Sequence, residues 1–86
     1  MIVRIPSPLR SYTSSRAEVH AAGGTVADVL ADLEQQNPGI RFRMIDEQDQ
    51  IRQHIKIFIN SDPVEDLNQS LAADDTLHII CALSGG

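Results

Sequence analysis

The feature that most constrains the fold is an amphipathic segment in the first half of the chain. Its apolar residues recur at the i, i+3, i+4 and i+7 spacing of one helical face: Val26, Val29, Leu30 and Leu33. Thr25 precedes them and Asp28 follows it by three residues, a spacing that favours a capped helix start. Pro38-Gly39 disfavours continuation of the helix beyond Asn37. A helix with one apolar face needs a second layer to cover that face.

Short strand-like segments on both sides of this helix can supply that layer. Met1–Ile5 and Ala17–Ala22 flank the polar stretch Ser7–Arg16, which predicts a hairpin with a long loop. His54–Asn60 and Leu77–Ala82 are the strands expected after the helix. Alternation along these segments assigns a set of apolar residues to the sheet face under the helix: Val3 or its neighbours, Val19, Ile55, Ile57, Ile59, Leu77 and Ile79.

The order strand, strand, helix, strand, strand predicts an α+β domain. We expect a mixed sheet of four or five strands with one main helix on one face, in a single small domain of 86 residues. Ile40–Ile45 is compatible with a short helix or an irregular apolar anchor, whereas its alternation alone favours a strand. Residues 46–53 are compatible with an exposed loop. Turns are expected at Asn60–Pro63 and Ala73–Thr76, with Val64 and Leu67 anchoring the segment between them.

Charge and composition exclude several classes of protein. The net charge of −5 argues against a nucleic-acid-binding protein, which normally presents a basic face. There is no basic segment followed by an apolar run at the N-terminus, and no apolar stretch near the roughly 20 residues that span a membrane. We therefore expect a cytoplasmic monomer with no membrane or nucleic-acid partner.

The interior of the chain offers no set of residues suited to catalysis or metal binding. His20, His54 and His78 stand on three different predicted strands, without the converging spacing of a zinc site. There is no G-x-x-x-x-G-K-[ST] loop for phosphates. Cys81 is interpreted as a small apolar strand residue rather than a reactive thiol. No catalytic residue and no metal site are predicted.

The sequence ends Leu83-Ser84-Gly85-Gly86, directly after the last predicted strand. Two glycines provide a bare backbone and an unhindered terminal carboxylate, which another protein's active site can admit. We expect residues 1–82 to form the domain and residues 83–86 to be a flexible tail. Extended, four residues reach roughly 13 Å, so the tail can enter a partner's channel while the domain docks outside.

Taken together, these features resemble the ubiquitin-like β-grasp proteins, and more narrowly the prokaryotic sulfur carriers (ThiS/MoaD-like). That family includes the thiamine-biosynthesis carrier and the small subunit of molybdopterin synthase. The nearest pattern is that of the cysteine-biosynthesis carriers. The resemblance is carried by short segments across nearly the whole chain: Val3-Arg4-Ile5-Pro6, Leu9-Arg10, Thr25-Val26, Asp32-Leu33-Glu34, Pro38-Gly39-Ile40, Met44-Ile45-Asp46, Ile57-Phe58-Ile59-Asn60, Asp75 to Ile80 and Gly85-Gly86. One departure is Cys81, where the family often has proline before the tail.

The resemblance implies that Gly86 is the reactive position and that Gly85, Ser84 and Leu83 form its tail. The carboxylate of Gly86 would be adenylated by an E1-like partner enzyme and converted to a thiocarboxylate. ATP and the sulfur donor would be used by partner enzymes, and this chain would bind no cofactor. A sulfur-accepting biosynthetic enzyme would be the second partner, and a JAMM-type metalloprotease that releases carrier-bound products a third.

The domain also needs a surface for these partners. Phe58 and Ile80 point away from the core-facing residues of their strands, and with Leu83 they would form an apolar patch on the uncovered sheet face. The alternative is that a second element, such as Ile40–Ile45, covers them.

Three functions remain open at this point. The first is a sulfur carrier, with cysteine the preferred product and thiamine, a thiolated tRNA base or another metabolite also open. The second is a ubiquitin-like modifier joined through Gly86 to target lysines. The third is a non-catalytic binding domain in which the Gly-Gly end is incidental.

Overall fold

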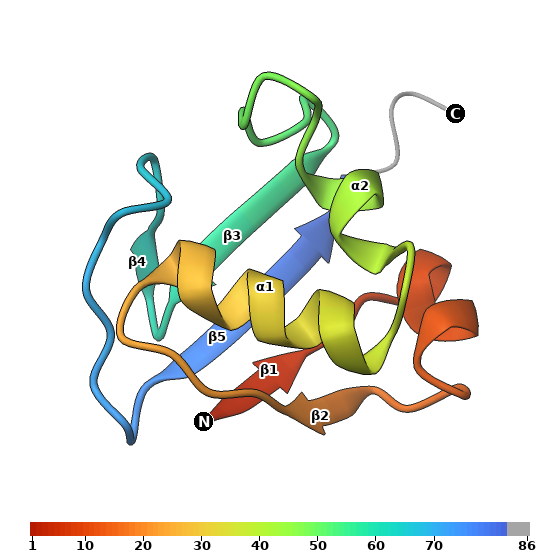
Figure 1. The fold of residues 1–86 in the computed structure, drawn as a ribbon, viewed down its shortest axis with the longest axis horizontal. Coiled ribbons are helices and arrows are strands. Elements are labelled where there is room, and N and C mark those ends of the chain that lie inside the picture. The colour runs from red at the N-terminus through yellow and green to blue at the C-terminus, as the bar shows by residue number, and fades with distance from the viewer. Residues whose placement is uncertain (83–86) are drawn as a thin grey trace.

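A five-stranded sheet with two helices on one face makes up the fold (Figure 1). The computed structural model describes residues 1–82. The strands lie in the order β2-β1-β5-β3-β4, with β1 parallel to β5 and every other neighbouring pair antiparallel. Their bounds are β1 Ile2–Arg4, β2 Glu18–His20, β3 Ile55–Ile59, β4 Asp62–Pro63 and β5 Thr76–Cys81. The predicted mixed sheet, including the hairpin of β1 and β2, is confirmed.

The main helix, α1 (Val26–Gln36), crosses the sheet as the sequence predicts. Thr25 Oγ1 accepts a hydrogen bond from the backbone N–H of Asp28 at 3.2 Å, which satisfies one of the free donors at the helix start. The helix ends at Asn37, whose N–H donates to Leu33 O at 2.9 Å. All four residues of the predicted apolar face are fully buried: Val26, Val29, Leu30 and Leu33.

The core lies between α1 and the sheet. The seven sheet residues assigned to the covered face are all buried: Val3, Val19, Ile55, Ile57, Ile59, Leu77 and Ile79. Because the core contains no large aromatic side chain, its stability depends on close fitting of aliphatic groups, each worth about 1.5–3 kcal/mol when fully buried.

Two connecting segments contain structure that the sequence did not specify. Ser7–Tyr12, predicted as part of a polar loop, forms a 3₁₀ helix, η1, which buries Leu9 against the core. The predicted turn Asn60–Pro63 contains the short edge strand β4, whose Pro63 lies opposite Phe58. Proline is tolerated there because an edge strand leaves one side of its backbone unpaired.

Ile40–Met44 forms the short helix α2, which resolves the alternatives for this segment in favour of a helix. Its residues Ile40 and Met44, with the following Ile45, are fully buried in the same core as α1. Since α2 lies on the α1 side of the sheet, it does not cover Phe58 or Ile80. The alternative that Ile40–Ile45 shields those two side chains is therefore wrong.

Candidate functional site

The last described part of the chain is anchored in the sheet up to Ala82. β5 ends at Cys81, and one further backbone hydrogen bond joins Ala82 N–H to His54 O at 2.7 Å. We call this place, where β5 ends beside the start of β3, the tail root. Leu83, Ser84, Gly85 and Gly86, to which the sequence assigns the reactive end, lie outside the described residues. Their assignment, and the boundary between domain and tail, stay predictions.

A shallow hollow of about 360 Å³ adjoins the tail root. Its walls come from η1, α2, the end of β5 and the residue before β3: Pro8, Leu9, Ser11, Tyr12, Arg43, His54, Cys81 and Ala82. The Cys81 side chain is half-buried, and burial raises the pKa of its thiol above the ordinary value. A thiol with a raised pKa is protonated and weakly nucleophilic at neutral pH, which agrees with the interpretation of Cys81 as an apolar strand residue.

Phe58 and Ile80 share the sheet face that no helix covers. In the antiparallel pairing of β3 with β5, Phe58 lies opposite His78 and Ile80 lies opposite Lys56. The pair between them, Ile57 with Ile79, faces the core, so Phe58 and Ile80 are diagonal neighbours on the opposite face. Ile80 is 46% exposed and Phe58 is half-buried. The two residues thus have the geometry expected of an apolar patch, and their use by a partner stays a prediction.

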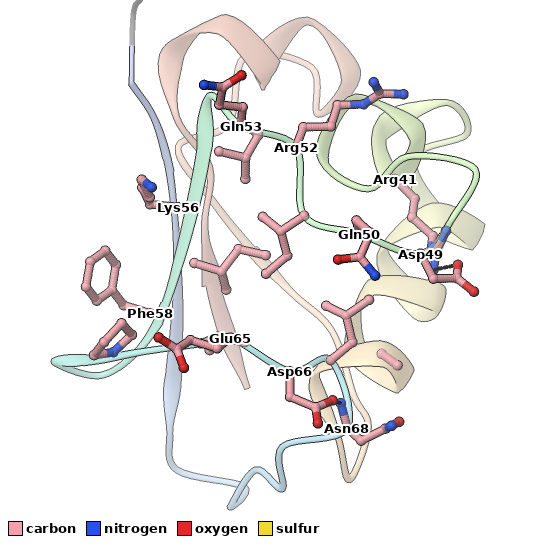
Figure 2. A pocket seen from close by; sticks show the side chains of 17 residues that line it. Arg41, Asp49, Gln50, Arg52, Gln53, Lys56, Phe58, Glu65, Asp66 and Asn68 are labelled. Atoms are coloured by element: carbon pink, nitrogen blue, oxygen red, sulfur yellow. Dashed lines mark hydrogen bonds and ion pairs between the residues drawn. The ribbon is translucent and has the colours of Figure 1, made fainter.

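A larger groove runs along the outer edge of β3 (Figure 2). It has a volume of about 870 Å³ and lies between the loop before β3 and the segment after β4. Sequence reasoning did not anticipate it, because its walls come from segments that have no common pattern. Figure 2 shows Arg52 and Gln53 at the end where β3 begins and Glu65, Asp66 and Asn68 at the other end.

The groove lacks the side chains that catalysis would require. Its charged residues are three cations and three carboxylates, and Arg41 is paired with Asp49 at 3.2 Å. None of its lining residues is a serine, threonine, cysteine, histidine or tyrosine, so it offers no activated hydroxyl or thiol with a neighbouring base. Across residues 1–82, no three His, Cys, Asp or Glu side chains gather as metal ligands.

The described helices include none that is long and apolar enough to cross a membrane.

Comparison with known proteins assigns the family. The sequence model of the ThiS family matches residues 3–86, a range that includes Gly85 and Gly86. The chain belongs to the ThiS family. Within this ThiS-family chain, the matched range covers both the sheet and the Gly-Gly end.

Relatives of this ThiS-family chain include proteins named sulfur carriers. The chain is 33% identical to the sulfur carrier protein CysO of Mycobacterium tuberculosis over 89 residues, which cover 98% of this chain and 96% of the relative. It is also similar to the crystal structure of the BexX/CysO complex of Amycolatopsis orientalis, with a TM-score of 0.91 and 32% identity over 99% of this chain and 98% of that one. The similarity at this level shows that the fold is the ubiquitin-like β-grasp fold.

A modifier protein has the same fold. The solution structure of the small archaeal modifier protein 1 from Methanosarcina acetivorans aligns with a TM-score of 0.81 and 26% identity, over 99% of this chain and 94% of that one. The family resemblance stated from sequence is therefore confirmed, while both a carrier and a modifier are found among the similar structures.

Proposed function

We propose that this chain carries sulfur as a thiocarboxylate on Gly86. The observation that carries the proposal is the match of the ThiS family through Gly86, together with 33% identity to a protein named as a sulfur carrier. The strand geometry supports it, since β5 lies between β1 and β3 and pairs with β1 through His78 and with β3 through Cys81, at the tail root. A central strand is a rigid base from which a short tail can be presented to a partner.

The proposed chemistry starts from the terminal carboxylate. Its pKa is ordinarily about 3.3–3.7, so Gly86 is ionised at neutral pH and can attack the α-phosphate of ATP, releasing pyrophosphate. The terminal sulfur of a partner's persulfide then displaces AMP and forms an acyl disulfide. A second thiolate of the partner attacks the partner's sulfur in this S–S bond, which forms a new disulfide on the partner and releases the thiocarboxylate on Gly86.

Partner enzymes supply the catalytic groups in this proposal. An E1-like enzyme binds ATP and adenylates Gly86, because the chain has no phosphate-binding loop of its own. The role of this chain is to dock and to present its end, as a carrier rather than an enzyme. Phe58 and Ile80 are the proposed docking residues, since they place apolar surface on the uncovered face of the sheet.

The second partner accepts the sulfur. Similarity to CysO favours a cysteine-forming acceptor, with thiamine, a thiolated tRNA base or another metabolite as alternatives. A solved relative is a complex of CysO with BexX, which supports the idea that a chain of this fold binds a partner protein. A JAMM-type metalloprotease that frees the product is a further proposed partner.

The test is activation by a purified adenylating enzyme. ATP–pyrophosphate exchange should depend on the wild-type chain and be abolished in a variant that lacks Gly86. Extending the C-terminus by one alanine is the matched control, because it keeps Gly86 but removes its free carboxylate. Retained activation or function of the extended chain would rule out any role for a free carboxylate at Gly86.

The alternative function is that of a protein modifier. It is favoured by the similarity to the small archaeal modifier protein 1. Both functions begin with adenylation, but a modifier ends in an isopeptide bond between Gly86 and a lysine of a target. Higher-mass conjugates in cells that disappear when Gly86 is deleted would identify the modifier. A third possibility is a binding domain without tail chemistry. It predicts that deletion of Gly86 changes neither pyrophosphate exchange nor the pattern of conjugates in cells.

A further inference from the structure

The two ends of the sheet differ in net charge. The segment from β3 to β5, residues 60–75, contains carboxylates and no Lys or Arg: Asp62, Glu65, Asp66, Asp74 and Asp75. The tail-root end, formed by residues 5–17 and 37–54, contains most of the basic residues: Arg10, Arg16, Arg41, Arg43 and Arg52. It also contains three carboxylates, Asp46, Glu47 and Asp49, so its formal net charge is +2, whereas that of residues 60–75 is −5. β5 has six residues, so the two ends are roughly 20 Å apart. Figure 1 shows these segments at opposite ends of β5.

Two arginine–aromatic pairs stand at the tail-root end. Arg52 lies 4.5 Å from the centroid of the Phe42 ring, and its Nε donates to Phe42 O at 2.7 Å. Arg43 lies 6.0 Å from the centroid of the Tyr12 ring, and its Nε donates to the Tyr12 hydroxyl at 2.7 Å. Phe42 and Arg43 are consecutive on α2. We call these four residues the basic–aromatic surface.

The positive charges of this surface are not neutralised by ion pairs. Within residues 1–82, the ion pairs are Arg4 with Glu18 and Arg41 with Asp49. Neither Arg43 nor Arg52 takes part in one. Arg52 is near enough to contribute to the lowered pKa of Asp46, but that carboxylate is mainly engaged by the N–H groups of Gln50 and Gln48.

The surface also combines charge with exposed apolar area. The Phe42 side chain is 56% exposed although it is large and apolar, and the guanidinium of Arg52 holds it in place. Aromatic residues and arginine are the residue types enriched where proteins bind one another. The adjoining hollow at the tail root is lined by Tyr12, Arg43 and Ala82, so the surface lies directly beside the place where the tail begins.

We propose that the basic–aromatic surface docks onto an acidic surface that surrounds the tail-accepting site of the adenylating enzyme. This inference rests on the proposed function. The basic end would approach such a partner while the acidic end at residues 60–75 is repelled from it, so the chain would arrive with its tail first. The surface is distinct from the Phe58 and Ile80 face, because it lies on the helix side at the end of the sheet.

The test compares two double variants of equal net charge. Arg43→Gln with Arg52→Gln removes two positive charges from the surface. Ser61→Asp with Asn68→Asp adds two negative charges at the opposite end, on exposed residues. In carrier-dependent pyrophosphate exchange, we expect the arginine double variant to have a kcat/KM lower by roughly tenfold or more, mainly because its KM is higher. We also expect the kcat/KM of this variant to depend less on salt concentration. We expect the second to stay within about twofold, since charges beyond a Debye length of about 10 Å are screened at 0.1 M salt.

Each outcome of this kinetic comparison has a different explanation. Equal losses in both variants would assign the effect to net charge, and unchanged kinetics in the arginine variant would assign no role to the surface; either overturns the inference. Arg43→Lys with Arg52→Lys should restore much of the activity, which a folding defect would not allow. If no enzyme activates the wild-type chain, the proposed function fails instead.

A second measurement does not need the enzyme. The ¹⁵N-labelled full chain is titrated with a short polyglutamate peptide and, separately, with a single-stranded DNA oligonucleotide. We expect the peptide to shift the amide signals of Phe42, Arg43 and Arg52, and the shifts to disappear in the Gln double variant. The inference would be overturned if DNA but not the peptide shifts these signals, or if neither ligand shifts them.

Discussion

At the scale of single residues, Glu34 connects the two helices. Its carboxylate accepts hydrogen bonds from Gly39 N at 2.8 Å and Arg41 N at 2.9 Å, which caps the start of α2. The backbone N–H of Gly39 is the main cause that lowers the pKa of Glu34 below its ordinary value, followed by that of Arg41. Glu34 thereby fixes the helix that holds Phe42 and Arg43.

Replacing Glu34 should make the chain less stable in a pH-dependent way. A carboxyl whose pKa is lowered by folding stabilises the protein above its unfolded pKa of about 4.3, and this contribution is lost as the pH falls through the folded value. We expect Glu34→Ala to lower the free energy of unfolding by about 1 kcal/mol at neutral pH. The difference from wild type should shrink below about pH 4.

Urea unfolding at neutral pH and at about pH 3 measures this difference, with Gln35→Ala on the exposed side of α1 as the control. If the unfolding free energies of Glu34→Ala and wild type differ by the same amount at both pH values, the Glu34 carboxylate does not cap α2.

Gly39 is required by the backbone and by its neighbour. Its φ of +98° lies in the left-handed region, and a Cβ there would be 3.1 Å from Tyr12 Cε1. Gly39→Ala should therefore lower the unfolding free energy by more than about 1 kcal/mol. Gly24→Ala is the matched control, because no atom lies within 4 Å of the added Cβ. Equal thermal stability of the two variants would contradict this account of Gly39.

At the scale of elements, the two faces of β5 have different surroundings. Ile79 is 3% exposed and faces the core, whereas Ile80 is 46% exposed and faces solvent beside Phe58. Because Ile79 and Ile80 are neighbours with the same side chain, replacing each in turn separates the contribution to core packing from the proposed contribution to docking.

We expect Ile79→Ala to cost about 2–5 kcal/mol of stability. Ile80→Ala should change stability by no more than about 0.5 kcal/mol and raise the KM for activation by the adenylating enzyme. Chemical unfolding and pyrophosphate exchange measure the two effects. An Ile80 variant with unchanged KM would remove this face from the proposed docking surface.

The elements also show what could be predicted from sequence. α1 is long enough for a periodic apolar face and has its cap at Thr25, so local pattern determines it. α2 has five residues, begins after a left-handed glycine and is capped by Glu34 from the preceding helix. Its sequence is too short to distinguish helix from strand, and the interaction that stabilises it is tertiary. η1 was missed for the same reason, because Leu9 is its one buried residue and a single apolar position makes no periodic pattern.

At the scale of the whole molecule, the topology brings distant residues together at the tail root. Placing β5 between β1 and β3 puts η1, α2 and the loop before β3 at one end of the sheet. The Tyr12–Arg43 hydrogen bond joins residues 31 apart in sequence. The alternation of the strands was enough to predict that Phe58 and Ile80 share the uncovered face. The basic–aromatic surface and the β3 groove depend on this folding and have no local signal.

The most direct test of the central claim is the intact mass of the chain isolated from its own cells. The protein is tagged at the N-terminus, so the C-terminus stays free, and a variant lacking Gly86 is the control. The account predicts a fraction whose mass is increased by the replacement of one oxygen with sulfur, located to Gly86 by fragmentation and absent from the control. Finding the unmodified mass together with Gly86-dependent lysine conjugates would contradict it.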